Sequence, residues 1–100
     1  MKVFWTENAV SHLDGIYAYI SNASEIYALR TVDRLTKRSE QIASFPLSGR
    51  SVPEIDLPQI REVIEGNYRI IYFIKPDQID VLAVIHCAQR FPWTDLRQQD

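Results

Sequence analysis

Three residues in the second half of the chain have the side-chain types that cleave RNA. Glu62, Arg69 and His86 supply a carboxylate, a guanidinium and an imidazole. In such a reaction one group deprotonates a 2′-hydroxyl, one stabilises the phosphate charge, and one protonates the leaving oxygen. The three residues form a candidate catalytic site if they lie on one face of a β-sheet.

The same residues also have a structural interpretation. Glu62 and Arg69 would then form an ion pair on a sheet edge, beside a hydrogen-bonded His86. Side chains alternate between the faces of a strand, so a slip of one residue in the strand register would separate the three groups. Because the register decides between the two interpretations, both stay open at this point.

Other reactive side chains indicate structure rather than chemistry. Cys87 is the only cysteine, so an internal disulfide and a multi-cysteine zinc site are excluded, and we expect no metal or cofactor. Nothing near Cys87 in the sequence would favour its thiolate, which suggests a small buried residue. His12 is expected on a helix surface. The basic residues of the second predicted helix are interspersed with acids and indicate a solvated face: Arg30, Arg34, Lys37 and Arg38.

Length and composition indicate a single globular domain. The chain has 100 residues, of which 46% are hydrophobic and 24% charged, with a formal net charge of −2. Thirteen acids against eleven bases disfavour a dedicated nucleic-acid binder, because such proteins neutralise phosphates with clustered positive charge. The N-terminus lacks the apolar region of a signal peptide, and no stretch reaches the roughly 20 apolar residues of a membrane span. We therefore expect a cytoplasmic protein.

The first half of the chain predicts a short strand and two helices. Residues 2–5 favour a strand, and Thr6 offers an oxygen that caps a helix over about residues 7–20. Apolar residues recur there at helical spacing: Ala9, Leu13, Ile16, Tyr17 and Ile20. A second apolar stripe, which ends before Pro46, runs through Ala28, Val32, Leu35 and Ile42. The short connection favours an antiparallel hairpin of helices.

The second half predicts strands after a loop that contains two prolines. Residues 60–64, 68–74 and 79–87 are rich in β-branched and aromatic side chains, with turns at Gly66-Asn67 and Pro76-Asp77. The element order β-α-α-β-β-β predicts an α+β fold in which an antiparallel sheet packs on a helical hairpin. We interpret residues 1–100 as one domain, with a tail from about residue 91 that docks or frays.

Alternation along the two longest strands predicts two apolar faces. If the turn at Pro76-Asp77 is symmetric, the face against the helices carries Tyr68, Ile70, Tyr72, Ile74, Ile79, Val81, Ala83 and Ile85. The second face then carries Arg69, Ile71, Phe73, Leu82, Val84 and His86. The two helices are already used, so this face is covered either by residues 46–58 and 91–98 or by another chain.

The order of these features resembles the ParE/RelE toxin superfamily over about residues 3–90. The matching segments are Trp5-Thr6, Pro46, Gly49-Arg50, Ile60-Arg61-Glu62, residues 68–72, residues 81–86 and Arg90. The resemblance implies the fold predicted above and a bacterial type II toxin–antitoxin module. In such a module an antitoxin from the same operon holds the toxin inactive, and its C-terminal segment wraps over the toxin's helices and sheet.

The two branches of this superfamily imply different functions. RelE-like members are ribosome-dependent mRNA endonucleases, whereas ParE-like members lack their catalytic set and poison DNA gyrase. Arg69 matches an arginine common to both branches, and His86 with Arg90 matches the close of the last strand in ParE-like sequences. Phe91 and Trp93 stand where RelE-like members have a tyrosine, and the chain is acidic where those members are basic. The resemblance therefore favours the ParE-like branch.

Three hypotheses follow from this resemblance. The first is a non-enzymatic toxin that inhibits DNA gyrase and forms a hetero-oligomer with its antitoxin. The second is an mRNA endonuclease that uses Glu62, Arg69, His86 and Arg90. The third is a degenerate toxin that acts only as a binding module. The candidate antitoxin-binding residues lie on the second face: Arg69, Ile71, Phe73, Leu82 and Val84.

Overall fold

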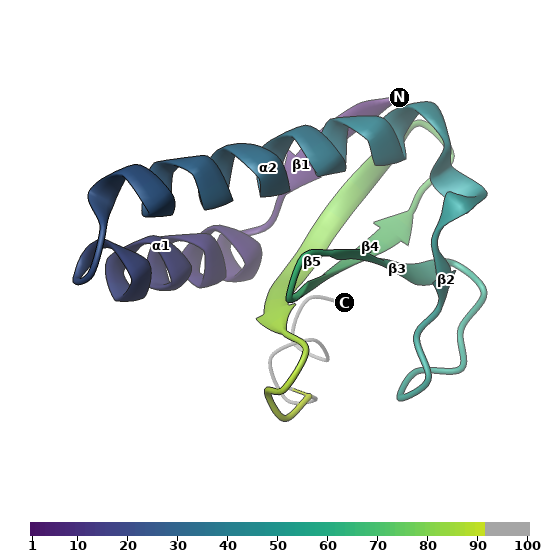
Figure 1. The fold of residues 1–100 in the computed structure, drawn as a ribbon. Helices are drawn as coiled ribbons and strands as arrows, with labels where there is room; N and C mark the ends of the chain where they lie inside the picture. The colour runs from purple at the N-terminus through teal and green to yellow at the C-terminus, as the bar shows by residue number, and fades with distance from the viewer. Residues whose placement is uncertain (92–100) are drawn as a thin grey trace.

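The computed structural model describes residues 1–91 as one α+β unit, which confirms the predicted fold class. Its elements are β1 (Lys2–Trp5), α1 (Glu7–Ser21), α2 (Glu25–Ser44), the short 3-10 helix η1 (Pro46–Ser48), β2 (Arg50–Ser51), β3 (Ile60–Glu65), β4 (Tyr68–Ile74) and β5 (Gln78–His86). Five strands form one sheet in the order β1-β5-β4-β3-β2. The helical hairpin lies over one face of this sheet (Figure 1).

The predicted helix starts and turns are confirmed by local hydrogen bonds and backbone angles. Thr6 accepts a bond from the Ala9 amide at the start of α1, and Ser24 accepts one from the Tyr27 amide at the start of α2. Gly66 has a φ of 58° in the β3–β4 turn, a left-handed conformation that favours glycine. The strand β2 was not predicted, because its two residues fall inside the proline-containing loop.

Strand β1 lies at the edge of the sheet beside β5, a position that the sequence analysis did not predict. It pairs parallel with β5, whereas the other three pairs of adjacent strands are antiparallel. It reaches only from Gln78 to Val81 along β5. From Val81 onward, the side chains of Thr6 and of residues in α1 bond the open edge of β5. The Thr6 hydroxyl donates to the Val81 carbonyl at 2.8 Å, the Asn8 amide donates to the Leu82 carbonyl at 3.0 Å, and His12 Nδ1 accepts from the Val84 amide at 3.2 Å. The start of α1 thus satisfies strand-edge groups that lack a strand partner.

The register between β4 and β5 contains a β-bulge that corrects the predicted faces. The three pairs next to the turn are as expected, from Ile74 opposite Ile79 to Tyr72 opposite Val81, but Ile71 then lies opposite Ala83. One extra residue of β5, Leu82, is inserted at this point. Every later side chain of β5 therefore changes face. The prediction was wrong for four residues, since Val84 and His86 lie on the helix side and Ala83 and Ile85 on the second side.

Two apolar clusters flank the sheet. Helix residues Ala9, Leu35 and Ile42 pack with the first side of the sheet in one cluster. On the second side, the loop residues Val52 and Ile55 pack with the sheet, and the cluster includes Ile60, Ile71, Leu82, Ala83 and Ile85. Of the two alternatives for the second face, cover by the chain's own loop is the one observed. The other segment expected to contribute, residues 91–98, lies outside the described residues from position 92 onward.

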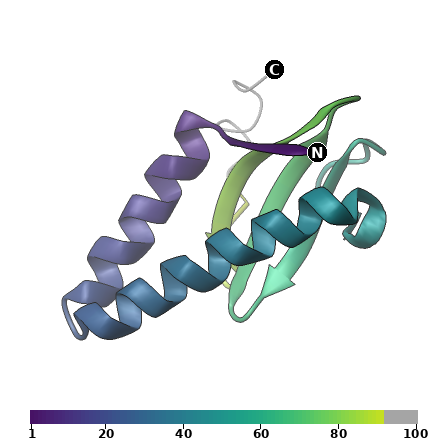
Figure 2. The ribbon, with the colours of Figure 1, turned by 90° about the horizontal axis from the view of Figure 1, so that it is seen from above.

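The helical hairpin extends beyond the sheet at its closed end. In both ribbon views the connection between α1 and α2 lies outside the strands, whereas the C-terminal half of α2 crosses over them (Figures 1 and 2). Helix α1 packs mainly on α2 and β5. Within residues 1–91 no helix combines the length and the apolar composition that a membrane span requires.

Candidate functional site

The second face of the sheet holds a chain of four alternating charges. Arg69 on β4 donates from Nε to Oε1 of Glu62 on β3 at 2.6 Å. Both terminal nitrogens of Arg69 donate to the carboxylate of Glu54, at 2.9 and 2.7 Å, in a bidentate pair. Arg50 donates to the remaining oxygen of Glu62 at 2.7 Å. All three guanidinium nitrogens of Arg69 are therefore bonded to carboxylates.

Burial and charge stabilise this arrangement. Glu62 is completely buried, and Arg69 is 8% exposed. The hydrogen bonds from Arg69 hold the pKa of Glu54 below its ordinary value, and the bonds to Glu54 raise the pKa of Arg69 above its own. The ring of Phe91 stacks against the Arg69 guanidinium, with 5.3 Å between the guanidinium carbon and the ring centroid. The cluster therefore joins the three strands β2, β3 and β4, the loop between β2 and β3, and the segment after β5.

The loop after β2 covers most of the candidate antitoxin-binding residues on the second face. Ile71 and Leu82 are buried beneath Val52 and Ile55, and Phe73 is half-buried. Val84 is buried on the opposite side, against the helices. An antitoxin that binds the predicted residues of this face would first have to displace the loop.

His86 lies apart from Glu62 and Arg69, so the structure does not bring the predicted catalytic trio together. Because of the bulge, the His86 ring lies on the helix side, where it meets Tyr68 edge-on at a centroid distance of 5.4 Å. His86 and His12 line a shared pocket of about 310 Å³ with Tyr68 and Tyr19. Both imidazoles accept a backbone amide at Nδ1, from Ala88 at 3.0 Å and from Val84 at 3.2 Å.

The remaining predicted residues lie at the surface. Arg90 is exposed after β5, and Cys87 is also exposed rather than buried as predicted. The Cys87 amide donates to the Asn67 carbonyl at 2.7 Å, which fixes its backbone beside the β3–β4 turn. Within residues 1–91, no three histidine, cysteine or acidic side chains lie close enough together to hold a metal ion.

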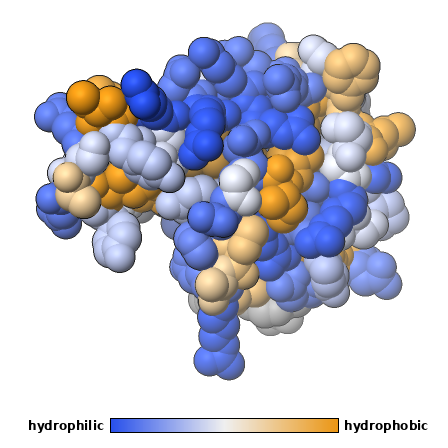
Figure 3. Space-filling view, viewed as in Figure 1, coloured by the Kyte–Doolittle hydropathy of each residue, from blue (hydrophilic) through white to orange (hydrophobic). Residues whose placement is uncertain are grey.

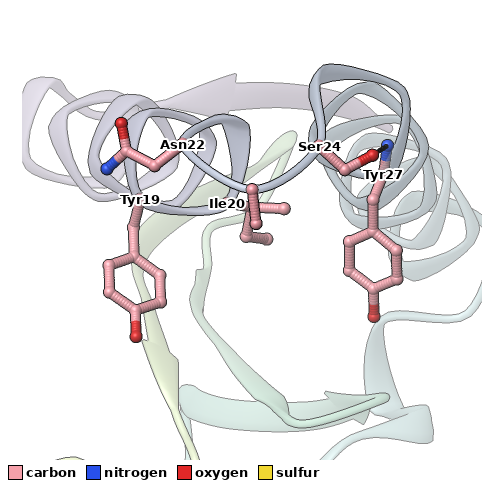
Figure 4. A pocket seen from close by; sticks show the side chains of 6 residues that line it. Tyr19, Ile20, Asn22, Ser24 and Tyr27 are labelled. Atoms are coloured by element: carbon pink, nitrogen blue, oxygen red, sulfur yellow. Dashed lines mark hydrogen bonds between the residues drawn. The ribbon is translucent and has the colours of Figure 1, made fainter.

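A larger pocket of about 590 Å³ lies where the helical hairpin leaves the sheet. Its lining residues are Tyr19, Ile20, Asn22, Ala23, Ser24 and Tyr27. Tyr19 of α1 and Tyr27 of α2 point to the same side and flank Ile20 (Figure 4). Tyr19 is 80% exposed and Tyr27 55% exposed. Apolar surface gathers over this end of the hairpin (Figure 3).

Sequence reasoning missed two features of these sites. Glu54 was not singled out because a carboxylate in a proline-containing loop has no periodic signal, although its position between the apolar Val52 and Ile55 was a clue to docking. The two pocket tyrosines, Tyr19 and Tyr27, were not part of either predicted apolar stripe and were given no role. Tyr19 breaks the helical spacing of the buried stripe, which was the available sign that it faces elsewhere.

Comparison with known proteins agrees with this fold and with the resemblance. Residues 3–91 match the family described as "ParE toxin of type II toxin-antitoxin system, parDE". The "Putative toxin Y4kP" of Sinorhizobium fredii (strain NBRC 101917 / NGR234) is 32% identical over 93 residues, which cover 91% of this chain and 93% of that protein. A chain of the chromosomal ParDE TA system from P. aeruginosa has the same fold, with a TM-score of 0.71, 22% identity, and coverage of 86% of this chain and 95% of that chain.

The family match spans all five strands and both helices of the described fold. The S. fredii relative extends the likeness over nearly the full length of both chains. This chain therefore belongs to the ParE toxin family of type II toxin–antitoxin systems.

Proposed function

We propose that this protein is a non-enzymatic toxin that binds DNA gyrase, blocks its supercoiling activity, and is neutralised by a cognate antitoxin protein in a hetero-oligomer. Membership of the ParE family supports the proposal at the level of the toxin–antitoxin module. The choice of a binding mechanism over catalysis rests on the geometry of Arg69.

Arg69 is the residue that an RNA-cleaving mechanism would use to hold the phosphate. Its three nitrogens already donate to Glu54 and Glu62. A phosphate could reach the guanidinium only by breaking buried ion pairs, and that would leave the fully buried Glu62 without its Arg69 partner. The imidazole of His86 lies on the other side of the sheet and cannot act on the same bond. This arrangement favours a structural role for Arg69.

The deciding experiment compares two activities of the purified protein. We expect it to inhibit ATP-dependent supercoiling of relaxed plasmid by gyrase and to leave mRNA intact in a purified translation system. Unchanged supercoiling together with cleaved mRNA would contradict the proposal. In that case His86→Ala, at an exposed position outside the ion pairs, tests the endonuclease hypothesis by removing cleavage without unfolding the chain.

The toxin and antitoxin parts of the proposal are tested in cells. Expression of the protein alone should stop growth, and co-expression of the neighbouring reading frame should restore it through a complex that co-purifies. Normal growth with the toxin alone would overturn the proposal and support a degenerate toxin that only binds its partner.

A further inference from the structure

The segment between β2 and β3 covers the second face with few buried groups. We call residues 52–59 the lid. Val52 and Ile55 are its two buried side chains, and they pack with the apolar cluster of the second face. The other side chains of the lid are exposed, apart from the partly buried Glu54. Figure 1 shows the chain leaving β2, turning back on itself and returning to β3. The lid is therefore attached to the sheet by two apolar side chains and one carboxylate.

The backbone of the lid is held by short-range contacts. The Ile55 amide, in the middle of the lid, donates to the Val52 carbonyl at 3.0 Å. At the end of the lid the Gln59 carbonyl accepts from the Ile74 amide of β4 at 2.8 Å. The preceding strand, β2, pairs with β3 over only two residues. Segments with few buried contacts and local hydrogen bonds open at a lower free energy than the core strands, so the lid can open before the sheet unfolds.

Arg69 is held in place by groups that do not belong to the lid. Its Nε donates to Oε1 of Glu62 at 2.6 Å, and the Phe91 ring lies over the face of the guanidinium. Arg50 donates to the other oxygen of Glu62 at 2.7 Å. If the carboxylate of Glu54 moves away, the buried Glu62 keeps both arginine partners, so no buried charge loses its partners. The terminal nitrogens of Arg69 that Glu54 releases then bond water.

Glu54 is the member of the charged cluster that can leave at the lowest cost. Its side chain is 33% exposed, whereas the Glu62 side chain has no exposed surface. Water therefore already reaches the Glu54 carboxylate in the closed structure and can hydrate it fully once the lid opens. A charge that exchanges one polar environment for another avoids the penalty of an unpaired buried charge.

Two prolines restrict the lid when it is open. Pro53 directly precedes Glu54, and Pro58 stands near the other end of the lid. Each proline fixes its own φ and biases the residue before it towards extended conformations. The open lid consequently has fewer conformations to lose when it closes, which lowers the entropic cost of returning to the sheet.

We propose that residues 52–59 form a lid that opens and closes over the second face while both helices and the strands β3, β4 and β5 stay folded. Glu54 is the latch, and Arg69 is its fixed partner. Opening carries Val52 and Ile55 away from the sheet and uncovers the apolar side chains beneath them. The second face is thus a surface that the protein exposes only transiently. This inference goes beyond the proposed function and does not depend on the identity of the target.

Cysteine labelling of the whole folded protein measures the opening. Ala83 and Val84 are adjacent on β5 and both buried, but Ala83 belongs to the cluster beneath the lid and Val84 to the cluster beneath the helices. Ala83→Cys and Val84→Cys, each combined with Cys87→Ser to remove the exposed native thiol, place one thiol under each cover. The rate of reaction with an excess of thiol reagent then reports how often each position is exposed.

The two thiols should differ in rate and in urea dependence. We expect the Ala83→Cys thiol to react at least about tenfold faster than the Val84→Cys thiol. Its rate should be nearly constant at low urea concentrations, because opening of the lid exposes little surface, whereas the rate of Val84→Cys should rise steeply with urea. Equal rates with equal urea dependence would overturn the proposal, because both faces would then open only when the whole chain unfolds.

Three further substitutions test the latch. Glu54→Gln should raise the Ala83→Cys rate about tenfold or more, since it removes charge-assisted hydrogen bonds, and the exposed Asp56→Asn in the same lid should change it by less than about twofold. Ser24→Ala weakens the cap of α2 and should accelerate Val84→Cys labelling about fivefold without changing the Ala83→Cys rate. An unchanged Ala83→Cys rate in Glu54→Gln would overturn the role of Glu54, and acceleration of both thiols by Ser24→Ala would overturn independent opening of the lid.

Amide hydrogen exchange of the unsubstituted protein makes the same comparison without new thiols. The Ile55 amide, which is bonded within the lid, should exchange with a weak urea dependence. The amides of β4, the central strand of the sheet, should exchange only on global unfolding. If the Ile55 amide and the β4 amides exchange together at every urea concentration, the lid does not open on its own, whether or not the cysteine variants fold.

Discussion

Arg69 and Glu62 face each other diagonally across two adjacent strands, with 2.6 Å between Nε and Oε1, and the Glu62 side chain is completely shielded from solvent. The pair connects β3 and β4 on the side of the sheet that the loop covers. Because Glu54 bonds the other edge of the same guanidinium, this contact also fixes the loop. The arginine that matches the family pattern is therefore at the centre of the fold.

Removal of Arg69 should destabilise the protein strongly. Arg69→Ala leaves the buried carboxylate of Glu62 without its main partner, a situation that costs about 3–5 kcal/mol. Arg50→Ala is the matched control, because the Arg50 side chain is 64% exposed and should contribute about 1 kcal/mol or less. Urea unfolding monitored by circular dichroism measures the free energy of unfolding of both variants. Equal losses of this free energy would show that the burial of the Arg69–Glu62 pair does not determine its contribution to stability.

Stability should fall on acidification through Glu54. The pKa of Glu54 is lowered in the folded protein, so the unfolded chain binds the proton more readily. The stability that Glu54 contributes is therefore fully present above the unfolded pKa of 4.5 and is lost as the pH falls through the folded pKa. Glu54→Gln should lower stability near neutral pH and reduce its loss between about pH 5 and pH 3. Asp56→Asn, in the same loop, is the control. Identical acid profiles of parent and Glu54→Gln would contradict the assignment.

The hydroxyl of Tyr72 should hold the chain segment that follows α2. It donates to the Pro46 carbonyl at 2.7 Å and accepts from the Gly49 amide at 3.0 Å, in a side chain with no exposed surface. Tyr72→Phe leaves both backbone groups without this partner and should cost about 1–3 kcal/mol in denaturant unfolding.

Gly49 offers a second test of the same contact. A Cβ atom there would lie 2.7 Å from the Glu62 carbonyl oxygen and would also clash with the Tyr72 hydroxyl. Gly49→Ala should therefore destabilise the protein, whereas Gly15→Ala should stabilise it. A Gly49→Ala variant with parental stability would show that η1 and β2 can shift without loss.

Thr6 should contribute more than an ordinary helix cap. Besides capping α1 it bonds the Val81 carbonyl of β5, so Thr6→Ala should cost about 2 kcal/mol. Ser24 caps α2 at an exposed position and makes only the capping bond, so Ser24→Ala should cost about 1 kcal/mol. Thermal unfolding of the two variants compares them. If Ser24→Ala were the more destabilising, the edge contact to β5 would have no energetic role.

The sequence by itself determined the helices, the long strands and their turns. Thr6, Gly66 and Pro76 act on residues within a few positions of themselves, and the spacing of apolar side chains depends only on the local period. These features specified the α+β fold and the family resemblance, which the comparison confirmed. The Glu62–Arg69 pair also followed from local register, because a two-residue turn at Gly66-Asn67 fixes β3 against β4.

Only the tertiary structure decided the location of His86 and the cover of the second face. At the bulge, the carbonyls of Val81 and Leu82 accept bonds from Thr6 and Asn8, which lie 74 to 76 positions away, and no local pattern encodes such a contact. One inserted residue then moved His86 from the side of Arg69 to the side of His12 and Tyr68. The period of a strand is two, so a single long-range irregularity was sufficient to separate a predicted catalytic site and to form a different pocket.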